Sequence, residues 1–190
     1  MNARLFILGV LHRGDFHPYE IKRRLEAAMV ECYIDVDVGT LYYAVRQLEK
    51  ERLISAVAEE RVARGGVRTI YRITGEGRRH FRDGLHRQLD ADGPVSHTLY
   101  GALLFLHLAD PEAVKNSLRR RIERLDDLIA KLAPIRNELA LKLSTGGDHL
   151  LRHIEQQRKL DRAWTQNLLV EIEKNGIRDV ADPKALAPTN

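Results

Sequence analysis

The feature that most constrains this chain is a change in the periodicity of its apolar residues at Gly93-Pro94. Before that point, stretches with helical spacing are followed by alternating β-branched residues, whereas after it helical spacing continues almost to the end. Because helices and strands bury side chains at different periods, the change indicates a mixed domain followed by an all-helical one. We expect domains at 1–90 and 94–176, with a disordered tail at 177–190.

The first domain predicts three helices. Apolar residues recur at helical spacing over 5–11, 21–29 and 41–48. Pro18 suits the first turn of the second helix, because its missing N–H would have no partner there. Asp37 is a plausible N-cap for the third.

A β-hairpin and a fourth helix follow. Residues 67–73 alternate as a strand does, and Gly65-Gly66 before them can supply the positive φ angles of a hairpin turn. Thr74 then caps a helix over 75–89. The predicted fold class is mainly α, with an N-terminal winged helix-turn-helix of three helices and a two-stranded wing, followed by an all-α dimerisation domain.

The third helix has one apolar side and one polar, aromatic side. At about 100° per residue, Tyr43, Arg46 and Lys50 point away from the apolar stripe, with Thr40 and Tyr42 on its flanks. The major groove of DNA admits one helix, whose exposed donors read base edges while hydroxyl groups hold phosphates. We therefore predict that Tyr43 and Arg46 read bases.

Positive charge is concentrated between residues 61 and 87. The 190-residue chain has 31 Lys and Arg against 27 Asp and Glu, a net charge of only +4. Residues 61–87 hold eight arginines against Glu76 and Asp83, so this stretch carries +6 and the rest of the chain −2. Such a distribution is typical of a surface that grips a phosphate backbone. The alternative is an ordinary solvated face.

The tip of the predicted hairpin has the chemistry of a DNA-binding wing. Gly65 and Gly66 would let its backbone approach DNA closely, and Arg64 and Arg68 lie on either side for contacts to phosphates or the minor groove. The wing and the third helix together point to double-stranded DNA as the partner.

Three segments carry a family resemblance. VGTLYYAVRQLEKERLI at 38–54, PYEI at 18–21 and YRITGEGR at 71–78 resemble the PadR family of bacterial transcriptional regulators in order and spacing. A Gly is usual in that family where this chain has Pro18, and another where it has Arg52. The second position often takes the left-handed conformation after a helix, where a non-Gly residue costs about 1 kcal/mol.

The resemblance implies a dimeric winged-helix repressor or activator whose C-terminal helices form the dimer, sometimes with a small-molecule effector. By motif matching, Tyr19, Thr40 and Tyr42 would contact DNA, and Gly65-Gly66 would lie at the wing tip. We expect a homodimer, acting as a repressor in the cytoplasm, that binds a palindromic operator. Its two recognition helices would enter successive turns of the duplex.

The second domain predicts three helices. Ser96 can cap a first, largely buried helix over 96–108, and Asp110-Pro111 is a start signal for the second. Residues 144–148 predict a turn ending in a cap, before a last helix over 149–174.

The second of these helices contains a proline, Pro134, and both the second and the last carry a stripe of apolar residues. A proline inside a helix loses a hydrogen bond and clashes with the preceding turn at a cost of about 3 kcal/mol, so we expect a kink or a break at Pro134.

Trp164 could line an effector pocket, although core or interface packing is the favoured interpretation. A long amphipathic helix needs a partner for its stripe, so we predict a dimer surface made by Leu118, Ile122, Leu125, Ile129, Leu132, Ile154, Trp164 and Leu168.

Several other classes of protein and site are excluded or disfavoured. A single cysteine, Cys32, excludes an intramolecular disulfide and suits a cytosolic protein. No apolar run reaches the roughly 18 residues that span a bilayer, and no catalytic constellation stands out, so we predict no membrane partner, enzyme activity or cofactor. His149 and His153 lack an apparent third metal ligand and are interpreted as a solvated pair, and Cys32 as a small buried hydrophobe.

One alternative from another functional class remains. A winged-helix domain can serve as a docking module that does not bind DNA, because fold alone does not assign function. Presentation of Arg46, Lys50 and the wing arginines on one exposed surface would favour DNA. Neutralisation of these cations by Glu59 and Glu60 would favour the adaptor.

Overall fold

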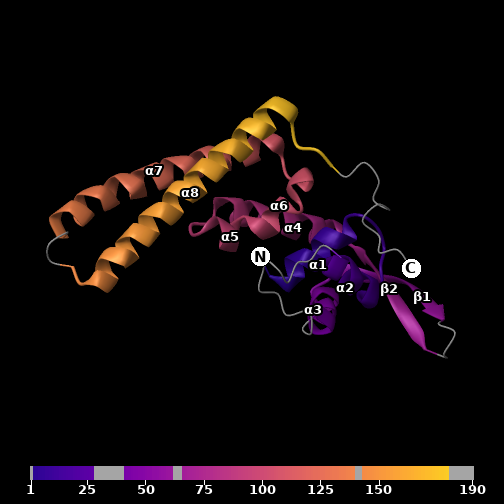
Figure 1. Cartoon of the computed structure of the whole chain (residues 1–190). Coiled ribbons are helices and arrows are strands. Elements are labelled where there is room, and N and C mark those ends of the chain that lie inside the picture. The colour runs from indigo at the N-terminus through magenta and orange to yellow at the C-terminus, as the bar shows by residue number, and fades with distance from the viewer. Residues whose placement is uncertain (1, 28–40, 62–65, 140–142, 180–190) are drawn as a thin grey trace.

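The N-terminal half folds as three helices, a hairpin and a fourth helix (Figure 1). The structure is a computed structural model that describes residues 2–27, 41–61, 66–139 and 143–179. The elements follow the predicted order, and the predicted winged helix-turn-helix is confirmed. They are α1 (Ala3–Leu11), α2 (Pro18–Ala27), α3 (Leu41–Lys50), β1 (Ile54–Arg61), β2 (Val67–Ile73) and α4 (Gly75–Asp90).

The wing is a two-stranded antiparallel hairpin extended by a short bridge. Ile54 pairs with Ile73 and Arg61 with Val67, and the register shifts between Ala56 and Ala58. At its base, Phe16 pairs with Tyr71 through two backbone hydrogen bonds of 3.1 and 3.0 Å. This bridge holds the start of α2 beside β2, a pairing that no local sequence pattern indicates.

The apolar stripes predicted for the first three helices meet in one core. Phe6, Ile21 and Leu48 are all fully buried, and Phe81 of α4 packs against Phe105 edge to face. Thr74 caps α4 as predicted, since its hydroxyl accepts a hydrogen bond from the Gly77 N–H. The core thus sets α3 with its polar side turned outward.

The C-terminal half is a long helical hairpin joined to the winged domain by short helical pieces. These pieces are α5 (Val95–Thr98), α6 (Tyr100–Leu103) and the 3₁₀ helix η3 (Leu106–Leu108). The helices α7 (Pro111–Leu139) and α8 (Thr145–Asn175) lie side by side and project away from the winged domain (Figure 1). Asp110 caps α7, as predicted.

The prediction of one helix capped by Ser96 is wrong. Ser96 lies inside α5, whose N-cap residue, Pro94, makes no side-chain capping bond. The Val95 N–H instead donates to a carboxylate oxygen of Asp161 on α8, 3.3 Å away. A carboxylate from a distant part of the chain thus satisfies a backbone N–H in the first turn of α5. The segment forms three short helices, α5, α6 and η3, instead of one.

Two boundaries in the long hairpin also differ from the prediction. Helix α7 continues through Pro134, so the expected break does not occur. Helix α8 starts at Thr145 instead of His149, because the Ser144 hydroxyl accepts a hydrogen bond from the Gly147 N–H and caps it four residues earlier. Gly176, with φ of 70°, ends α8.

Replacing Arg52 by glycine is expected to stabilise the protein. Arg52 has φ of 58°, as its position after the third helix predicted. Left-handed backbone costs a residue with a Cβ about 1 to 2 kcal/mol, and the greater freedom of glycine in the unfolded chain offsets about 0.4 to 1 kcal/mol of that. Urea unfolding should show a gain of roughly 0.5 to 1 kcal/mol. An unchanged or lower midpoint would contradict the strain at Arg52.

Candidate nucleic-acid interface

The outer face of α3 presents aromatic and cationic side chains to solvent. Tyr42 is 46% exposed and Tyr43 66%, and Arg46 and Lys50 are also exposed. Large aromatic side chains are normally buried, so two adjacent exposed tyrosines on one helix indicate a contact surface.

The two acids at the end of α3 are held by other elements. Glu49 accepts a hydrogen bond of 3.1 Å from the Tyr71 hydroxyl on β2, and Glu51 forms an ion pair with Arg4 on α1. No ion pair within the described part of the chain involves Arg46 or Lys50. The exposed face of α3 therefore keeps its positive charge.

The wing and α2 meet through Arg68 and Tyr19. The Arg68 guanidinium lies 5.7 Å from the centre of the Tyr19 ring, and that ring stacks on His17 at 6.1 Å with 14° between the planes. Tyr19 is 49% exposed. Two residues that are 49 positions apart thus form one contact surface, which the Phe16–Tyr71 bridge makes possible.

The charges in this region shift the pKa values of neighbouring groups. Burial and the nearby Arg68 charge lower the pKa of His17. A neutral His17 ring can use Nδ1 to accept the Glu20 N–H at 3.1 Å, in the first turn of α2. Burial and the hydrogen bond to Glu49 raise the pKa of Tyr71, so its hydroxyl stays protonated and continues to donate to Glu49.

Part of the charge between residues 61 and 87 is neutralised. The Arg72 guanidinium donates to both carboxylate oxygens of Asp15, with Nε 3.0 Å from each, and these hydrogen bonds lower the pKa of Asp15. Arg79 forms an ion pair with Glu76. Glu76 is already counted in the net charge of +6, so only the Arg72–Asp15 pair makes that figure overstate the charge that the surface offers to a ligand.

The acids of β1 form no ion pair with the described cation of the wing, Arg68. Glu60 lies opposite Arg68 in the strand register, and Glu59 lies opposite Thr69. Within the described ranges, neither acid forms an ion pair with Arg68, whose guanidinium lies over the Tyr19 ring instead. Among the described wing residues, Arg68 therefore keeps its positive charge available.

Some predicted residues lie outside the described part of the chain. They are Thr40 and its helix cap Asp37, the wing residues Arg64 and Gly65, and Cys32. Gly66, at the described edge of the wing, is exposed.

A family model matches the region that carries this surface. The model is that of the transcriptional regulator PadR-like family, and it matches residues 7–83. Over residues 7–83, the chain is therefore similar to this family. The matched region runs from α1 into α4 and includes Tyr19, the α3 face and Arg68. It is a family of transcriptional regulators, not of enzymes.

Several solved structures of bacterial transcriptional regulators align with about 90% of the chain, with TM-scores below 0.5. A PadR-like transcriptional regulator from Bacillus cereus is 23% identical, with 90% of this chain and 98% of that one covered and a TM-score of 0.37. Bacillus subtilis PadR in complex with operator DNA is 16% identical, with 89% and 98% covered and a TM-score of 0.42. The Vibrio cholerae virulence activator AphA is 19% identical, with 90% and 98% covered and a TM-score of 0.39. No curated protein matches the chain.

The residues predicted for the dimer surface fall into two groups. Leu118, Ile122 and Leu125 are buried within one chain, at 1%, 8% and 4% exposure. The other five are half-buried: Ile129, Leu132, Ile154, Trp164 and Leu168. The seam is therefore partly covered by packing inside the chain. More apolar surface stays open on the hairpin at four leucine and isoleucine side chains that the prediction did not name: Leu128, Ile135, Leu150 and Leu160.

The remaining sequence features show no second site. Trp164 packs against the core, and its ring centre lies 6.5 Å from that of Tyr100. His149 and His153 are exposed, and no cluster among the described residues has the composition of a metal site. No described helix is long and apolar enough to cross a membrane.

Sequence reasoning missed two contributors to the surface, His17 and the Phe16 bridge. A signal existed, because a residue that precedes proline is biased toward extended backbone, and His17 precedes Pro18. The pairing partner of that extended residue could not be read from the pattern, since one strand residue can pair with any exposed edge.

Proposed function

We propose that this protein is a sequence-specific DNA-binding transcriptional regulator. Two observations carry the proposal: the exposed side chains of Tyr42, Tyr43, Arg46 and Lys50 on α3, and the exposed contact of Arg68 on the wing with Tyr19. The cations among these side chains lack carboxylate partners within the described residues. The PadR-like match over the same residues supports the proposal independently.

The proposed contacts divide into two kinds. Tyr43 and Arg46, in the middle of the exposed face of α3, read base edges in the major groove. The remaining residues position the phosphate backbone: Tyr19, Thr40, Tyr42, Lys50, Arg64, Gly65, Gly66 and Arg68.

The proposed active form is a homodimer on a palindromic operator. Residues 1–90 form the DNA-binding domain and 94–176 the dimerisation domain, with the half-buried and exposed apolar side chains of α7 and α8 at the interface. A two-fold dimer matches a palindrome, because each subunit then meets the same half-site. We further propose that it acts in the cytoplasm as a repressor under the control of a small-molecule effector. One solved relative, Bacillus subtilis PadR, is described in complex with p-coumaric acid.

Replacing Lys50 and Arg68 together by alanine tests the phosphate contacts. Each phosphate contact contributes about one unit to the slope of log binding constant against log salt concentration. Because each subunit of the proposed dimer loses two contacts, the double variant should lower the magnitude of that slope by about four and weaken binding to all duplexes alike. Arg152→Ala, at a site paired with Asp148 on α8, is the matched control. An unchanged slope in the double variant would show that Lys50 and Arg68 do not contact DNA phosphates.

Selection of genomic fragments by the purified protein tests sequence specificity. An enriched palindrome is the expected result, and it would support both the operator and the dimer. Recovery of no enriched sequence at moderate salt would instead favour the protein-interaction adaptor.

A further inference from the structure

His17 is the residue that caps the start of α2. Its Nδ1 accepts a hydrogen bond from the Glu20 N–H at 3.1 Å, and its carbonyl oxygen accepts from the N–H groups of Glu20 and Ile21 at 3.0 and 3.1 Å. A capping side chain satisfies one of the backbone donors that a helix leaves unpaired in its first turn. The backbone of α2 therefore holds the His17 ring in place.

This hydrogen bond fixes the tautomer of the His17 ring. A backbone N–H is always a donor, so the ring nitrogen that receives it carries no proton. In a neutral imidazole the proton then lies on the other nitrogen, Nε2. Burial and the charge of Arg68 lower the pKa of His17, against the opposite effect of Glu20 and Glu60, so the ring is neutral at pH 7. His17 thus offers Nε2–H as a donor, and no described residue accepts a hydrogen bond from it.

Two further donors lie beside this ring. The Tyr19 ring stacks on the His17 ring, with 6.1 Å between the ring centres, and the Arg68 guanidinium lies 5.7 Å from the centre of the Tyr19 ring. Arg68 and Tyr19 are both exposed. The Phe16–Tyr71 bridge, next to His17 in the chain, holds the start of α2 at β2. A ring N–H, a phenol hydroxyl and a guanidinium are therefore gathered on one side of the winged domain.

The nearby acids do not serve as acceptors for this group of donors. Glu20 forms ion pairs with Arg24 at 2.8 Å and with Arg23 at 3.9 Å. Glu60 lies opposite Arg68 in the strand register but forms no ion pair with it among the described residues. Several donors without an acceptor suit a ligand group that carries several oxygens, and the phosphodiester of DNA is such a group.

We propose that His17 is a further phosphate-contacting residue, which donates Nε2–H to a DNA backbone phosphate beside Tyr19 and Arg68. The inference rests on the proposed function, because it adds a residue to the same DNA-binding surface. His17 acts as a neutral donor, since a proton on Nδ1 would remove the acceptor that caps α2. Arg68 supplies the charge at this phosphate, and His17 links the phosphate to the first turn of α2.

The cap and the stack also prepare this contact before DNA arrives. The hydrogen bond to Glu20 holds the His17 ring, and the Tyr19 ring lies between His17 and Arg68 in the chain of contacts. Side chains that are already ordered lose little conformational freedom on binding. A single substitution at His17 is therefore expected to have a measurable effect on DNA affinity.

Replacing His17 by asparagine separates the cap from the phosphate contact. Asparagine is among the best capping residues, so His17→Asn should keep the native midpoint of urea unfolding, whereas His17→Ala should lower it. Both variants lose Nε2–H and should bind the operator at least about tenfold more weakly, because each half-site loses a hydrogen bond to a charged group. His153→Asn, at an exposed histidine of α8, is the matched control and should keep native affinity. Native affinity in His17→Asn would overturn the proposal.

The salt dependence of operator binding reports the charge of the ring. A neutral donor displaces no counter-ion, so His17→Asn should keep the native slope of log binding constant against log salt concentration. Arg68→Ala should lower the magnitude of the slope by about two, one unit for each subunit of the proposed dimer. A lower slope in His17→Asn would show that the ring binds as a cation and would refute the neutral donor.

Nuclear magnetic resonance of isotope-labelled histidine nitrogens tests the tautomer without DNA. The His17 signals, assigned by their loss in His17→Asn, should show Nδ1 without a proton and Nε2 with one at pH 7. Addition of operator duplex should then shift the Nε2 signal. A proton on Nδ1 in the free protein, or an Nε2 signal that operator leaves unchanged, would overturn the proposal.

These measurements distinguish failure of the inference from failure of the proposed function. If the native protein binds no duplex, the proposed function and the contact at His17 are both refuted. If the native protein and His17→Asn bind operator equally, only the contact at His17 is refuted, and the residue is a helix cap alone.

Discussion

A protein in which Tyr43 and Arg46 are both replaced by alanine is expected to bind its operator at least about 30 times more weakly. The two side chains stand on the exposed middle of α3, with Tyr43 at 66% exposure and Arg46 without an ion pair to any described residue. A good base contact contributes about 1 to 3 kcal/mol of discrimination against the wrong base. Binding to unrelated duplex should fall much less, because most of its energy comes from phosphate contacts.

Fluorescence anisotropy with operator and scrambled duplexes measures both affinities. Unfolding by urea should show that the double variant is as stable as the native protein, since neither side chain contributes to the core. The control variant Arg152→Ala should bind the operator as tightly as the native protein in the same assay. Equal losses on operator and scrambled duplex would assign Tyr43 and Arg46 to the phosphates rather than to the bases.

Replacing Gly77 by alanine is expected to destabilise the protein by about 3 kcal/mol, at the upper end of the usual cost of overpacking. A Cβ at this position would lie 2.0 Å from the Leu53 carbonyl oxygen and 2.9 Å from the Ile73 side chain. The carbonyl cannot move freely, because it accepts hydrogen bonds from both the N–H and the hydroxyl of Thr74. The first turn of α4 would therefore have to separate from the base of the wing.

Gly75, two residues earlier in the same helical turn, is the matched control. A Cβ there meets nothing within 4 Å, so Gly75→Ala should be neutral or stabilise by up to about 1 kcal/mol through helix propensity. Urea unfolding of the two variants measures the difference. Similar midpoints for Gly75→Ala and Gly77→Ala would contradict the close approach of α4 to Leu53.

The elements of the winged domain could be predicted because local rules and burial agree there. The apolar residues of 41–48 lie on one helical face, and that face is buried. Thr74 caps α4 and Arg52 has a positive φ, both as their neighbours in the sequence implied. Two errors, the Ser96 cap and the start of α8, arose where the local signal was ambiguous. Asp161 satisfies the N–H of Val95 from 66 positions away, and no local pattern indicates such a partner.

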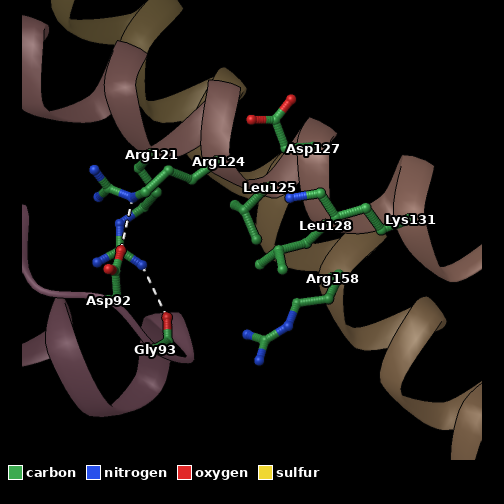
Figure 2. Close-up of a pocket in the computed structure, with 9 residues that line it drawn as sticks. All are labelled: Asp92, Gly93, Arg121, Arg124, Leu125, Asp127, Leu128, Lys131 and Arg158. Carbon is green, nitrogen blue, oxygen red and sulfur yellow. Dashed lines mark hydrogen bonds and ion pairs between the residues drawn. The ribbon is translucent and has the colours of Figure 1, made fainter.

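The sequence by itself determined which residues are exposed on α3, where the wing forms and that the second half is helical, because each depends on spacing within a single element. It also determined the positive charge of the wing, since charge is a matter of composition. Only the tertiary structure decided which of those charges remain available. Asp15 pairs with Arg72, and the Tyr19 ring lies under Arg68, because the Phe16–Tyr71 bridge brings segments about 50 residues apart into contact. Folding likewise brings Asp92, Arg121 and Arg158, from three separate segments, around one cavity (Figure 2).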